Sequence, residues 1–502
     1  MAHLDFMTKQ IEANLVTISE LVGLDYLPEI LSHENGHRYI PGDLKTFMRL
    51  TDAAVEVLKD RSLADLARNL FDDFEDNLGV FRRGMRTIAA VYHVLWHTSP
   101  HSDPVISVIG RAYELFFESL APAQRVQGYI IPIERVTSEI EKAAREIVAI
   151  FQNLQRLYWT TAIKRFAKIL EPFLKKSQQV NPQDQPGATP LSLSKVDIRN
   201  FIPGKKVDAK DLEGRLIGIT RDLGRDEGEV PCTFKRFQGF LAGNGVGLKP
   251  SKALAWYYRD SIGNQTVKIP EVNVKAGTAV PYTLAPWRVS DDPDLLDLWA
   301  SMMNGVLIPG LTAKRWVYKK GEHVSVGRDW PDLVIVIDSS NSMEDPEDTY
   351  SHAVASAMII SHSFLETQKQ VYAVNFSGNG QFTSTANFTV TEDEVDDTLT
   401  VYYNGGTHLP YPAMQKPFRL SARPKYFVMI TDLEIGNLDP KEFQKIFSAS
   451  CGGTIFLIDR GQDVAATVAI LESCGFNVIP VKDIADLEGH ALQLTHRLFE
   501  ER

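Results

Sequence analysis

Apolar residues in the N-terminal third recur every three or four positions, the spacing that places them on one face of an α-helix. This pattern covers residues 44–60, 61–80, 86–97 and 137–170. Residues 1–176 are therefore predicted to form a helical domain.

The pattern changes twice in the following part of the chain. Residues 177–195 are rich in Gln, Pro and Ser and poor in apolar residues, a composition typical of a linker. Residues 196–325 mix helical patterns, as at 252–262, with extended ones, as at 265–274. We predict a mixed α+β middle region, and its sequence indicates no role.

The last part of the chain alternates short apolar runs with amphipathic segments. Continuous apolar runs, typical of strands buried on both faces, occupy residues 333–338, 370–376, 425–431, 454–459 and 476–481. Helical patterns separate or follow them at residues 352–366, 440–449, 465–474 and 486–501. Residues 326–502 are therefore predicted to form an α/β doubly wound parallel sheet with its ligand site at the carboxyl ends of the strands.

Composition narrows the classes of function. The net charge of −11 and the pI near 5.6 argue against a general nucleic-acid binder. The sequence shows neither a signal-peptide pattern nor a run of about 18 apolar residues, so we expect a cytoplasmic protein with no membrane segment. Its three cysteines, Cys232, Cys451 and Cys474, are too dispersed for a disulfide framework or a CxxC zinc site. Any metal ion is expected to have nitrogen and oxygen ligands.

The first candidate chemistry is the pentad His33, Glu34, Asn35, Gly36, His37. On a helix, residues four apart share a face, so both imidazoles can bind one metal ion while Glu34 reaches a water molecule beside it. Residues 27–31 precede the pentad at helical spacing, and residues 39–42 supply a stop signal. Gly36 costs a helix about 1 kcal/mol relative to Ala, which indicates a packing reason for a residue without a side chain.

The pentad resembles the HExGH active-site helix of zinc peptidases. This resemblance implies Zn²⁺ held by His33 and His37, with Glu34 as the catalytic general base. A catalytic zinc needs a third protein ligand. The string NLFDD resembles the NxxED segment of gluzincins, which implies Asp72 as the metal ligand and Asp73 beside it, although Asp is one methylene shorter than the usual Glu. Glu75 and Asp76, on the same predicted helix, and a ligand elsewhere in the chain are the alternatives. Tyr39, His93 and His97 are candidate oxyanion donors by residue type.

A second constellation follows the apolar run at 333–338. Asp338, Ser340 and Ser342 place one carboxylate and two hydroxyls on a single turn, and oxygen donors suit a hard ion such as Mg²⁺. With Thr407 and Asp432 in the same order, these residues resemble the metal-ion-dependent adhesion site of von Willebrand factor A domains. The resemblance implies a Mg²⁺ site, with Mn²⁺ or Ca²⁺ as alternatives, and one coordination position open to a carboxylate on a protein ligand.

Prokaryotic members of that family with a C-terminal A domain often work beside MoxR-type AAA+ ATPases, which implies such a partner here. The chain has no GxxxxGK[ST] motif, so the ATPase would be a separate protein. We predict a zinc-dependent peptidase, acting on a protein or peptide, whose A domain recruits a partner or substrate. The alternatives are a non-enzymatic adaptor or co-chaperone of the ATPase and a chelatase-like subunit, which makes no use of the pentad.

Overall fold

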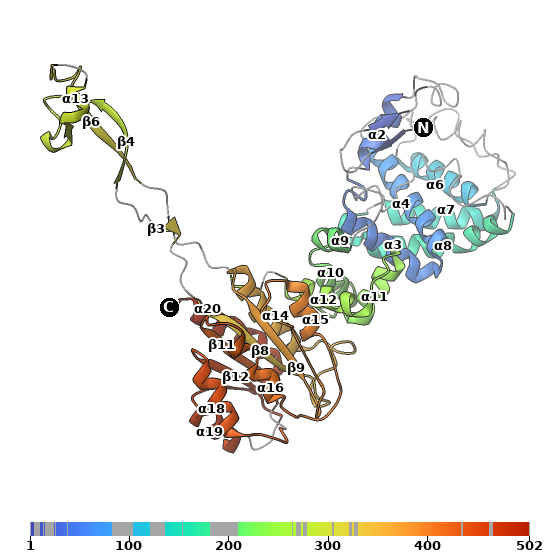
Figure 1. Ribbon diagram of the computed structural model, residues 1–502. Helices are drawn as coiled ribbons and strands as arrows, with labels where there is room; N and C mark the ends of the chain where they lie inside the picture. The colour runs from blue at the N-terminus through green and yellow to red at the C-terminus, as the bar shows by residue number, and fades with distance from the viewer. Residues whose placement is uncertain are drawn as a thin grey trace. The chain divides into compact units, whose positions relative to one another are not determined.

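Two compact units make up the described chain of the computed structural model (Figure 1). One unit comprises residues 1–263 with 344–351, and the other comprises residues 264–343 with 352–502. The predicted middle region is thus divided, because residues 209–263 belong to the first unit. The structure describes residues 2–4, 11–13, 15, 25, 27–37, 39–82, 104–120, 136–152, 154–180, 209–263, 265–267, 273–274, 279–303, 306–320, 324–325, 330–432, 435–460 and 465–500.

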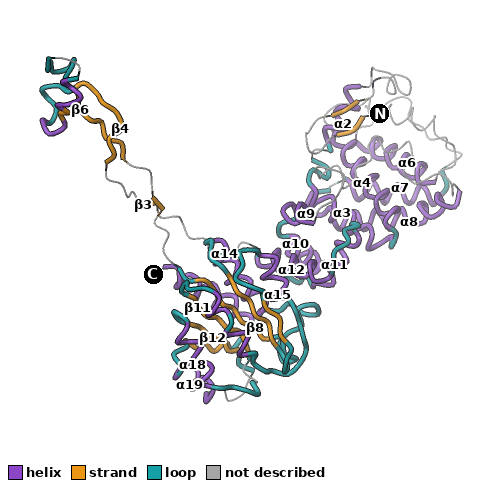
Figure 2. Tube along the Cα trace, in the orientation of Figure 1, coloured by secondary structure: helices purple, strands orange, loops and turns teal. Residues whose placement is uncertain are grey.

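The described part of the first unit is helical, apart from a pair of short antiparallel strands, β1 (Ala2–Leu4) and β2 (Ile11–Ala13). Figure 2 shows the strands of the larger sheet in the second unit and mostly helices in the first unit. Its described helices are α2 (Leu27–Gly36), α3 (Leu44–Leu58), α4 (Arg61–Arg82), α6 (Pro104–Leu120), α7 (Ser138–Phe151), η4 (Arg156–Tyr158), α8 (Trp159–Val180), α9 (Ala209–Arg215), α10 (Ile219–Glu227), α11 (Phe234–Gly243) and α12 (Pro250–Ile262).

The core of the first unit lies among α3, α4, α6, α7 and α8. Phe71 and Phe74 of α4 pack in a tilted arrangement against Phe151 of α7, and Phe71 also packs edge-on against Phe166 of α8. Burying such rings contributes about 2 kcal/mol each, so this cluster fixes which face of α4 turns inward. Helix α8 continues to Val180, so the first residues of the predicted linker are helical; its remainder, 181–195, lies outside the described residues.

The second unit is built on a six-stranded, mostly parallel sheet with the order β10-β9-β8-β11-β12-β13. Only β10 runs antiparallel to its neighbour. The chain proceeds from β8 to β9 in one direction and from β11 to β12 in the other, so the order reverses between β8 and β11. The strands are β8 (Asp332–Asp338), β9 (Val371–Phe376), β10 (Phe382–Ser384), β11 (Lys425–Thr431), β12 (Gly453–Ile458) and β13 (Asn477–Val481).

Helices cover both faces of this sheet. One face packs its apolar side chains, including Val336 and Met429, against Phe443 and Ile446 of α18 and Leu471 of α19. On the other side, α14 packs on β8 and against α20. The described helices here are α14 (His352–Glu366), α15 (Glu392–Leu399), α16 (Tyr411–Gln415), α17 (Pro417–Leu420), α18 (Pro440–Ala449), α19 (Ala465–Ser473), η7 (Ile484–Asp486) and α20 (Leu487–Glu500). The predicted α/β sheet is confirmed in this part of the chain.

A small antiparallel sheet precedes the parallel one in the sequence. Its order is β4-β6-β5, formed by β4 (Ala279–Pro286), β5 (Leu296–Asp297) and β6 (Lys314–Lys320). The helices η6 (Pro293–Leu295) and α13 (Leu298–Met302) lie between these strands in sequence. Two further short strands, β3 (Asn273–Val274) and β7 (Val324–Ser325), pair with each other. Among the described helices of the whole chain, none is both long and apolar enough to cross a membrane.

Candidate metal centres

Helix α2 presents the pentad as the sequence predicts. The helix begins with Leu27 and Pro28 and ends at Gly36, where the carbonyl accepts hydrogen bonds from the backbone amides of Tyr39 and Ile40. His37 follows the last helical residue, still one turn after His33. The imidazole rings lie 4.8 Å apart between centroids, and both are buried together with Glu34.

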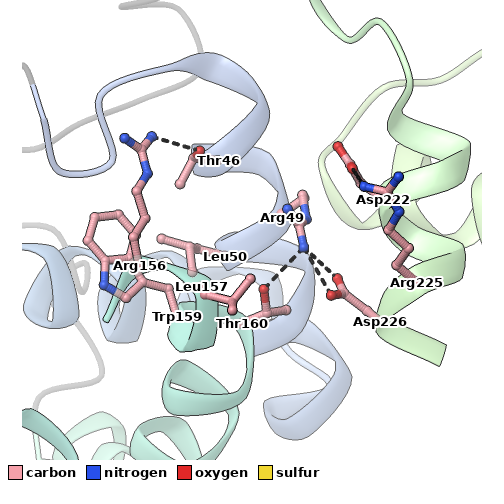
Figure 3. A pocket seen from close by; sticks show the side chains of 10 residues that line it. All are labelled: Thr46, Arg49, Leu50, Arg156, Leu157, Trp159, Thr160, Asp222, Arg225 and Asp226. Atoms are coloured by element: carbon pink, nitrogen blue, oxygen red, sulfur yellow. Dashed lines mark hydrogen bonds and ion pairs between the residues drawn. The ribbon is translucent and has the colours of Figure 1, made fainter. Parts of the chain in front are cut away.

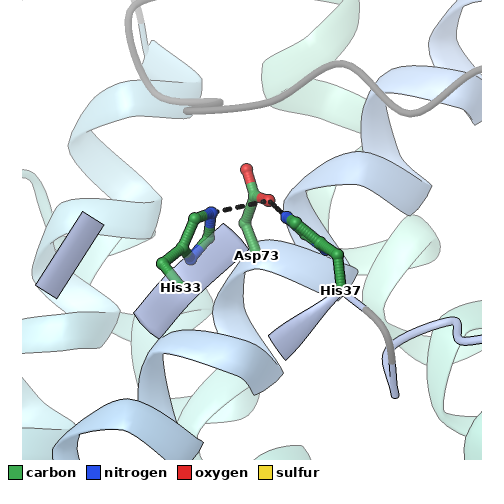
Figure 4. Close-up of side chains that lie close together, drawn as sticks. All are labelled: His33, His37 and Asp73. Carbon is green, nitrogen blue, oxygen red and sulfur yellow. Dashed lines mark ion pairs between the residues drawn. The ribbon is translucent and has the colours of Figure 1, made fainter. Parts of the chain in front are cut away.

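An aspartate from α4 meets the two histidines (Figure 4). Asp73 Oδ1 lies 3.4 Å from His37 Nε2 and 3.7 Å from His33 Nε2. These separations are long for direct hydrogen bonds. They fit two ligands of one tetrahedral zinc ion, which are about 3.4 Å apart when each bond is about 2.1 Å. The three donor atoms thus surround a point that a small divalent ion can occupy.

The other nitrogen of each imidazole is held away from this point. His37 Nδ1 lies 3.0 Å from the carbonyl oxygen of Ile40, and His33 Nδ1 lies 3.0 Å from Asn77 Oδ1. Asn77 in turn donates through Nδ2 to the hydroxyl of Tyr113 on α6, at 2.8 Å. An acceptor at Nδ1 favours the tautomer whose Nε2 carries a lone pair, which is the arrangement around metal-bound histidines.

Several buried polar atoms of this cluster lack a hydrogen-bond partner among the described residues. They are His33 Nε2, both carboxylate oxygens of Glu34 and both of Asp73. An unpaired buried charge costs several kcal/mol, so two such carboxylates at one place favour a bound cation. A divalent ion is the group that this donor set of nitrogen and oxygen atoms fits.

The pKa values show the same excess of negative charge. Burial alone would lower the pKa of His37, but Asp73, Asp76 and Glu34 outweigh it and raise the value to about 10. Burial raises the pKa of Glu34 to about 7, against the opposing effect of the two histidines. The cluster therefore attracts positive charge to the space between the imidazoles.

Asp72, the predicted third ligand, points elsewhere. Its Oδ2 accepts a hydrogen bond of 2.5 Å from Arg68 Nη1 one turn earlier on α4, and this buried ion pair keeps it apart from the His33–His37 pair. Burial raises the pKa of Asp72 to about 6, in opposition to Arg68. The structure thus places Asp73, rather than Asp72, in the position of a third ligand.

The other acidic candidates also have distinct positions. Glu75 is not part of the group of donors around the histidines. Asp76 approaches His33 from its far side, with Oδ2 at 3.1 Å from Nδ1. Of the candidate oxyanion donors, Tyr39 is exposed, and His93 and His97 lie outside the described residues.

The predicted packing reason for Gly36 is confirmed. A Cβ atom at this position would overlap the carboxyl group of Asp76. Asp76 can therefore approach His33 only because residue 36 has no side chain. The helix accepts a poor helix former at the point where α4 brings a carboxylate against it.

The second candidate centre lies at the carboxyl ends of β8 and β11, where the strand order reverses. Asp338, the last residue of β8, is buried; its Oδ1 accepts from the Ser340 backbone amide at 2.9 Å and its Oδ2 from Thr431 Oγ1 at 2.7 Å. The hydroxyls of Ser340 and Ser342 lie 3.0 Å apart. Burial raises the pKa of Asp338 to about 6, against these hydrogen bonds.

Backbone hydrogen bonds bring the loop of Thr407 to the same edge. The Asn341 amide donates to the Gly405 carbonyl at 2.8 Å, and the Asn404 amide donates to Ser339. On the other side, the Gly436 amide donates to the carbonyl of Thr407 at 3.1 Å. The loops that carry Asp338, Thr407 and Asp432 are thus adjacent at this edge.

Asp432 has a cationic neighbour in this arrangement. Its Oδ2 lies 3.4 Å from Arg460 Nε, a residue that follows β12 and that sequence reasoning missed. Asp432 also raises the pKa of Asp338, so the two carboxylates influence each other. A metal ion here would share the acidic edge with a guanidinium group.

A third feature of the first unit is a cavity of about 210 Å³ between α3, α8 and α10 (Figure 3). Arg49 lies in its wall, where Nη2 is within 3.0 Å of both carboxylate oxygens of Asp226 and 3.4 Å from Thr160 Oγ1. Arg156 similarly pairs with Asp43. Because these two arginines are already paired with carboxylates, we assign no anion site to the cavity.

Comparisons with known proteins give a limited result. No family model and no curated protein matches the chain. Similar solved structures include a von Willebrand factor type A protein from Catenulispora acidiphila, at 14% identity, with a TM-score of 0.28, over 34% of this chain and 43% of that one. BatB, a conserved hypothetical protein from Bacteroides thetaiotaomicron, matches at 11% identity, with a TM-score of 0.27, over 34% of this chain and 99% of that one.

Proximal thread matrix protein 1 from the mussel byssus matches at 15% identity, with a TM-score of 0.28, over 34% of this chain and 48% of that one. The chain thus spans less than half the length of two of these three structures. At such TM-scores the similarities carry no conclusion about the activity. The mostly parallel sheet itself is compatible with an A-domain-like α/β fold.

Proposed function

We propose that the chain is a zinc-dependent hydrolase of peptide bonds. The observation that carries this proposal is the convergence of His33 Nε2, His37 Nε2 and Asp73 Oδ1, with the unpartnered carboxylate of Glu34 beside them. A zinc ion bound there would act as a Lewis acid toward a carbonyl oxygen and a water molecule. The choice of peptide bonds rests on the resemblance of the pentad to zinc peptidases.

The residues of the chain have separate tasks in this mechanism. His33, His37 and Asp73 would hold the ion, while Asn77 and the Ile40 carbonyl keep the two imidazoles oriented. Glu34 takes a proton from the attacking water and returns it to the leaving amine. Burial favours the neutral form of Glu34 and raises its pKa, which suits a group that must both accept and release a proton.

The decisive experiment combines zinc analysis with peptide cleavage. Glu34→Gln should retain one zinc ion per chain and lose hydrolysis of a fluorogenic peptide library by about 100-fold or more. Glu75→Gln is the matched control, because Glu75 is an acidic residue of α4 outside the donor group. It should leave zinc content and cleavage unchanged.

Two outcomes would contradict the proposal. Unchanged cleavage by Glu34→Gln would remove Glu34 from the mechanism. A purified chain with Mg²⁺ but no stoichiometric zinc would instead favour the adaptor of a AAA+ ATPase. The chelatase-like alternative has no observation in its favour among the described residues.

We further propose that the sheet edge around Asp338 binds Mg²⁺ and, through it, a carboxylate of a partner protein. The adjacency of the Asp338, Thr407 and Asp432 loops supports this assignment. A MoxR-type ATPase is the partner that the resemblance suggests. If the sheet domain regulates the hydrolase, Asp338→Ala should change turnover or partner affinity without changing zinc content; no change in either would leave the domain with a structural role.

A further inference from the structure

The segment between β5 and β6 of the small sheet carries an unusual amount of exposed apolar surface. Trp299 is 85% exposed, Met303 84% and Val306 81%. Their neighbours Leu298, Met302 and Leu311 are also largely exposed. We call the surface formed by these six residues the apolar tip.

Helix α13 buries its polar residue and exposes its apolar ones, which is the reverse of a helix in an ordinary monomer. Ser301, its polar residue, is fully buried: its Oγ accepts from the Lys314 amide at 2.7 Å and donates to the Asp297 carbonyl at 2.5 Å. Trp299 and Met302, on the same helix, face solvent. Monomers usually bury the apolar face of a helix and expose the polar one.

Local hydrogen bonds hold the tip in this orientation. Asp297 caps α13 by accepting from the Ala300 amide at 2.9 Å, and its other oxygen accepts from Trp316 Nε1 at 2.7 Å. In the following loop, the Gly310 amide donates to the Trp287 carbonyl at 2.6 Å. The exposed side chains therefore stand on an ordered backbone, which lowers the entropy cost of binding.

The size of the tip matches one side of a protein interface. Each of the six residues is 56–85% exposed, so their combined exposed area is on the order of the 800 Å² that a stable interface buries per partner. The tip is thus large enough to form a dimer contact by itself.

We propose that the apolar tip binds the tip of a second copy of this chain. Residues 298–313 contain no charged side chain, although 23% of the whole chain is charged. In a dimer with twofold symmetry, the same surface of both copies forms the contact, so charged residues in it would meet charges of the same sign. A surface without charges avoids this repulsion. The rest of the chain, with its net charge of −11, is less suited to self-association.

The strand beside the tip disfavours another mode of association, the addition of a strand to the sheet edge. Pro281 and Pro286 in the edge strand β4 lack the amide hydrogens that strand addition requires. Contact through side chains is therefore the expected mode.

The test measures the mass of the full-length chain by sedimentation over a range of concentrations. The wild type should be dimeric, and Trp299→Asp combined with Met303→Asp should raise the dimer dissociation constant by 100-fold or more. Val390→Asp is the matched control, because Val390 is an exposed apolar residue (61%) outside the tip. It should leave the dimer intact.

A second measurement locates the contact independently of stability. In a Cys451→Ser background, Met303→Cys should give covalent dimers with a bismaleimide cross-linker, and Val390→Cys should not. A wild type that stays monomeric at about 100 μM, where such an interface should be saturated, would overturn the proposal. A dimer whose dissociation constant is unchanged in the double variant would also overturn it. A monomer that binds anionic vesicles through Trp299 would overturn it as well.

Discussion

The two candidate metal sites differ in how completely their buried polar side chains form hydrogen bonds and ion pairs with other residues of the chain. In the helical unit, Glu34 and Asp73 are buried without hydrogen-bond partners among the described residues. At the sheet edge, Asp338 accepts from Ser340 and Thr431, and Asp432 faces Arg460. Burying unpaired charges is costly, so we expect the stability of the helical site to depend on a cation more strongly than that of the sheet site.

Removal of zinc should therefore have the largest effect. If the ion is present at about 1,000 times its dissociation constant, its removal lowers the free energy of unfolding by about 4 kcal/mol. Hydrogen exchange should then increase in α2 and α4 and stay unchanged in β8 and β11. Equal exchange in all four elements, with and without a chelator, would refute the difference between the sites.

The identity of the third ligand can be decided next. Asp73→Asn should weaken zinc binding by at least about 100-fold, because it removes a charged ligand. Asp72→Asn should instead cost about 3 kcal/mol of stability, since Arg68 would lose its buried partner, while the folded protein keeps its zinc. Zinc titration of both variants measures this; loss of zinc only in Asp72→Asn would restore the sequence prediction.

A smaller effect is expected at Gly36. Gly36→Ala should weaken zinc binding by about 10-fold, because the added methyl group displaces Asp76 from beside His33. Gly239→Ala on α11 is the matched control, since a Cβ there meets no other atom within 4 Å. That control should gain up to about 1 kcal/mol of stability from helix propensity. If Gly36→Ala, like the control, keeps its zinc affinity, the approach of Asp76 to α2 has no role in metal binding.

Magnesium should have the smallest effect. At a concentration near its dissociation constant, Mg²⁺ adds less than about 1 kcal/mol to the stability of the sheet domain. Asp338→Ala should abolish this shift in thermal unfolding and leave zinc content unchanged. A loss of several kcal/mol of stability on magnesium removal would show that the sheet site depends on its ion as strongly as the helical site does.

Most of the sheet could be predicted because its elements are short and strongly patterned. The apolar run at 425–431 and the helices at 352–366 and 440–449 match the structure to the residue. The edge strand β10 was missed, since its three residues, Phe382 to Ser384, carry too short a pattern. The helix of the pentad was predictable for the same reason, since residues 27–36 combine helical spacing with a start and a stop signal.

The sequence by itself determined that His33 and His37 share a face, because a separation of four residues is a local property of a helix. It could not decide between Asp72 and Asp73, which point about 100° apart on α4. The packing of Phe71 and Phe74 against α7 and α8 sets the rotation of α4 about its axis, and this directs Asp73 to the histidines. An Arg68–Asp72 pair at i and i+4 was the one local signal for that choice. The partners Asn77 and Tyr113, like the outward side chains of the apolar tip, follow only from contacts between distant segments, which a local pattern does not encode.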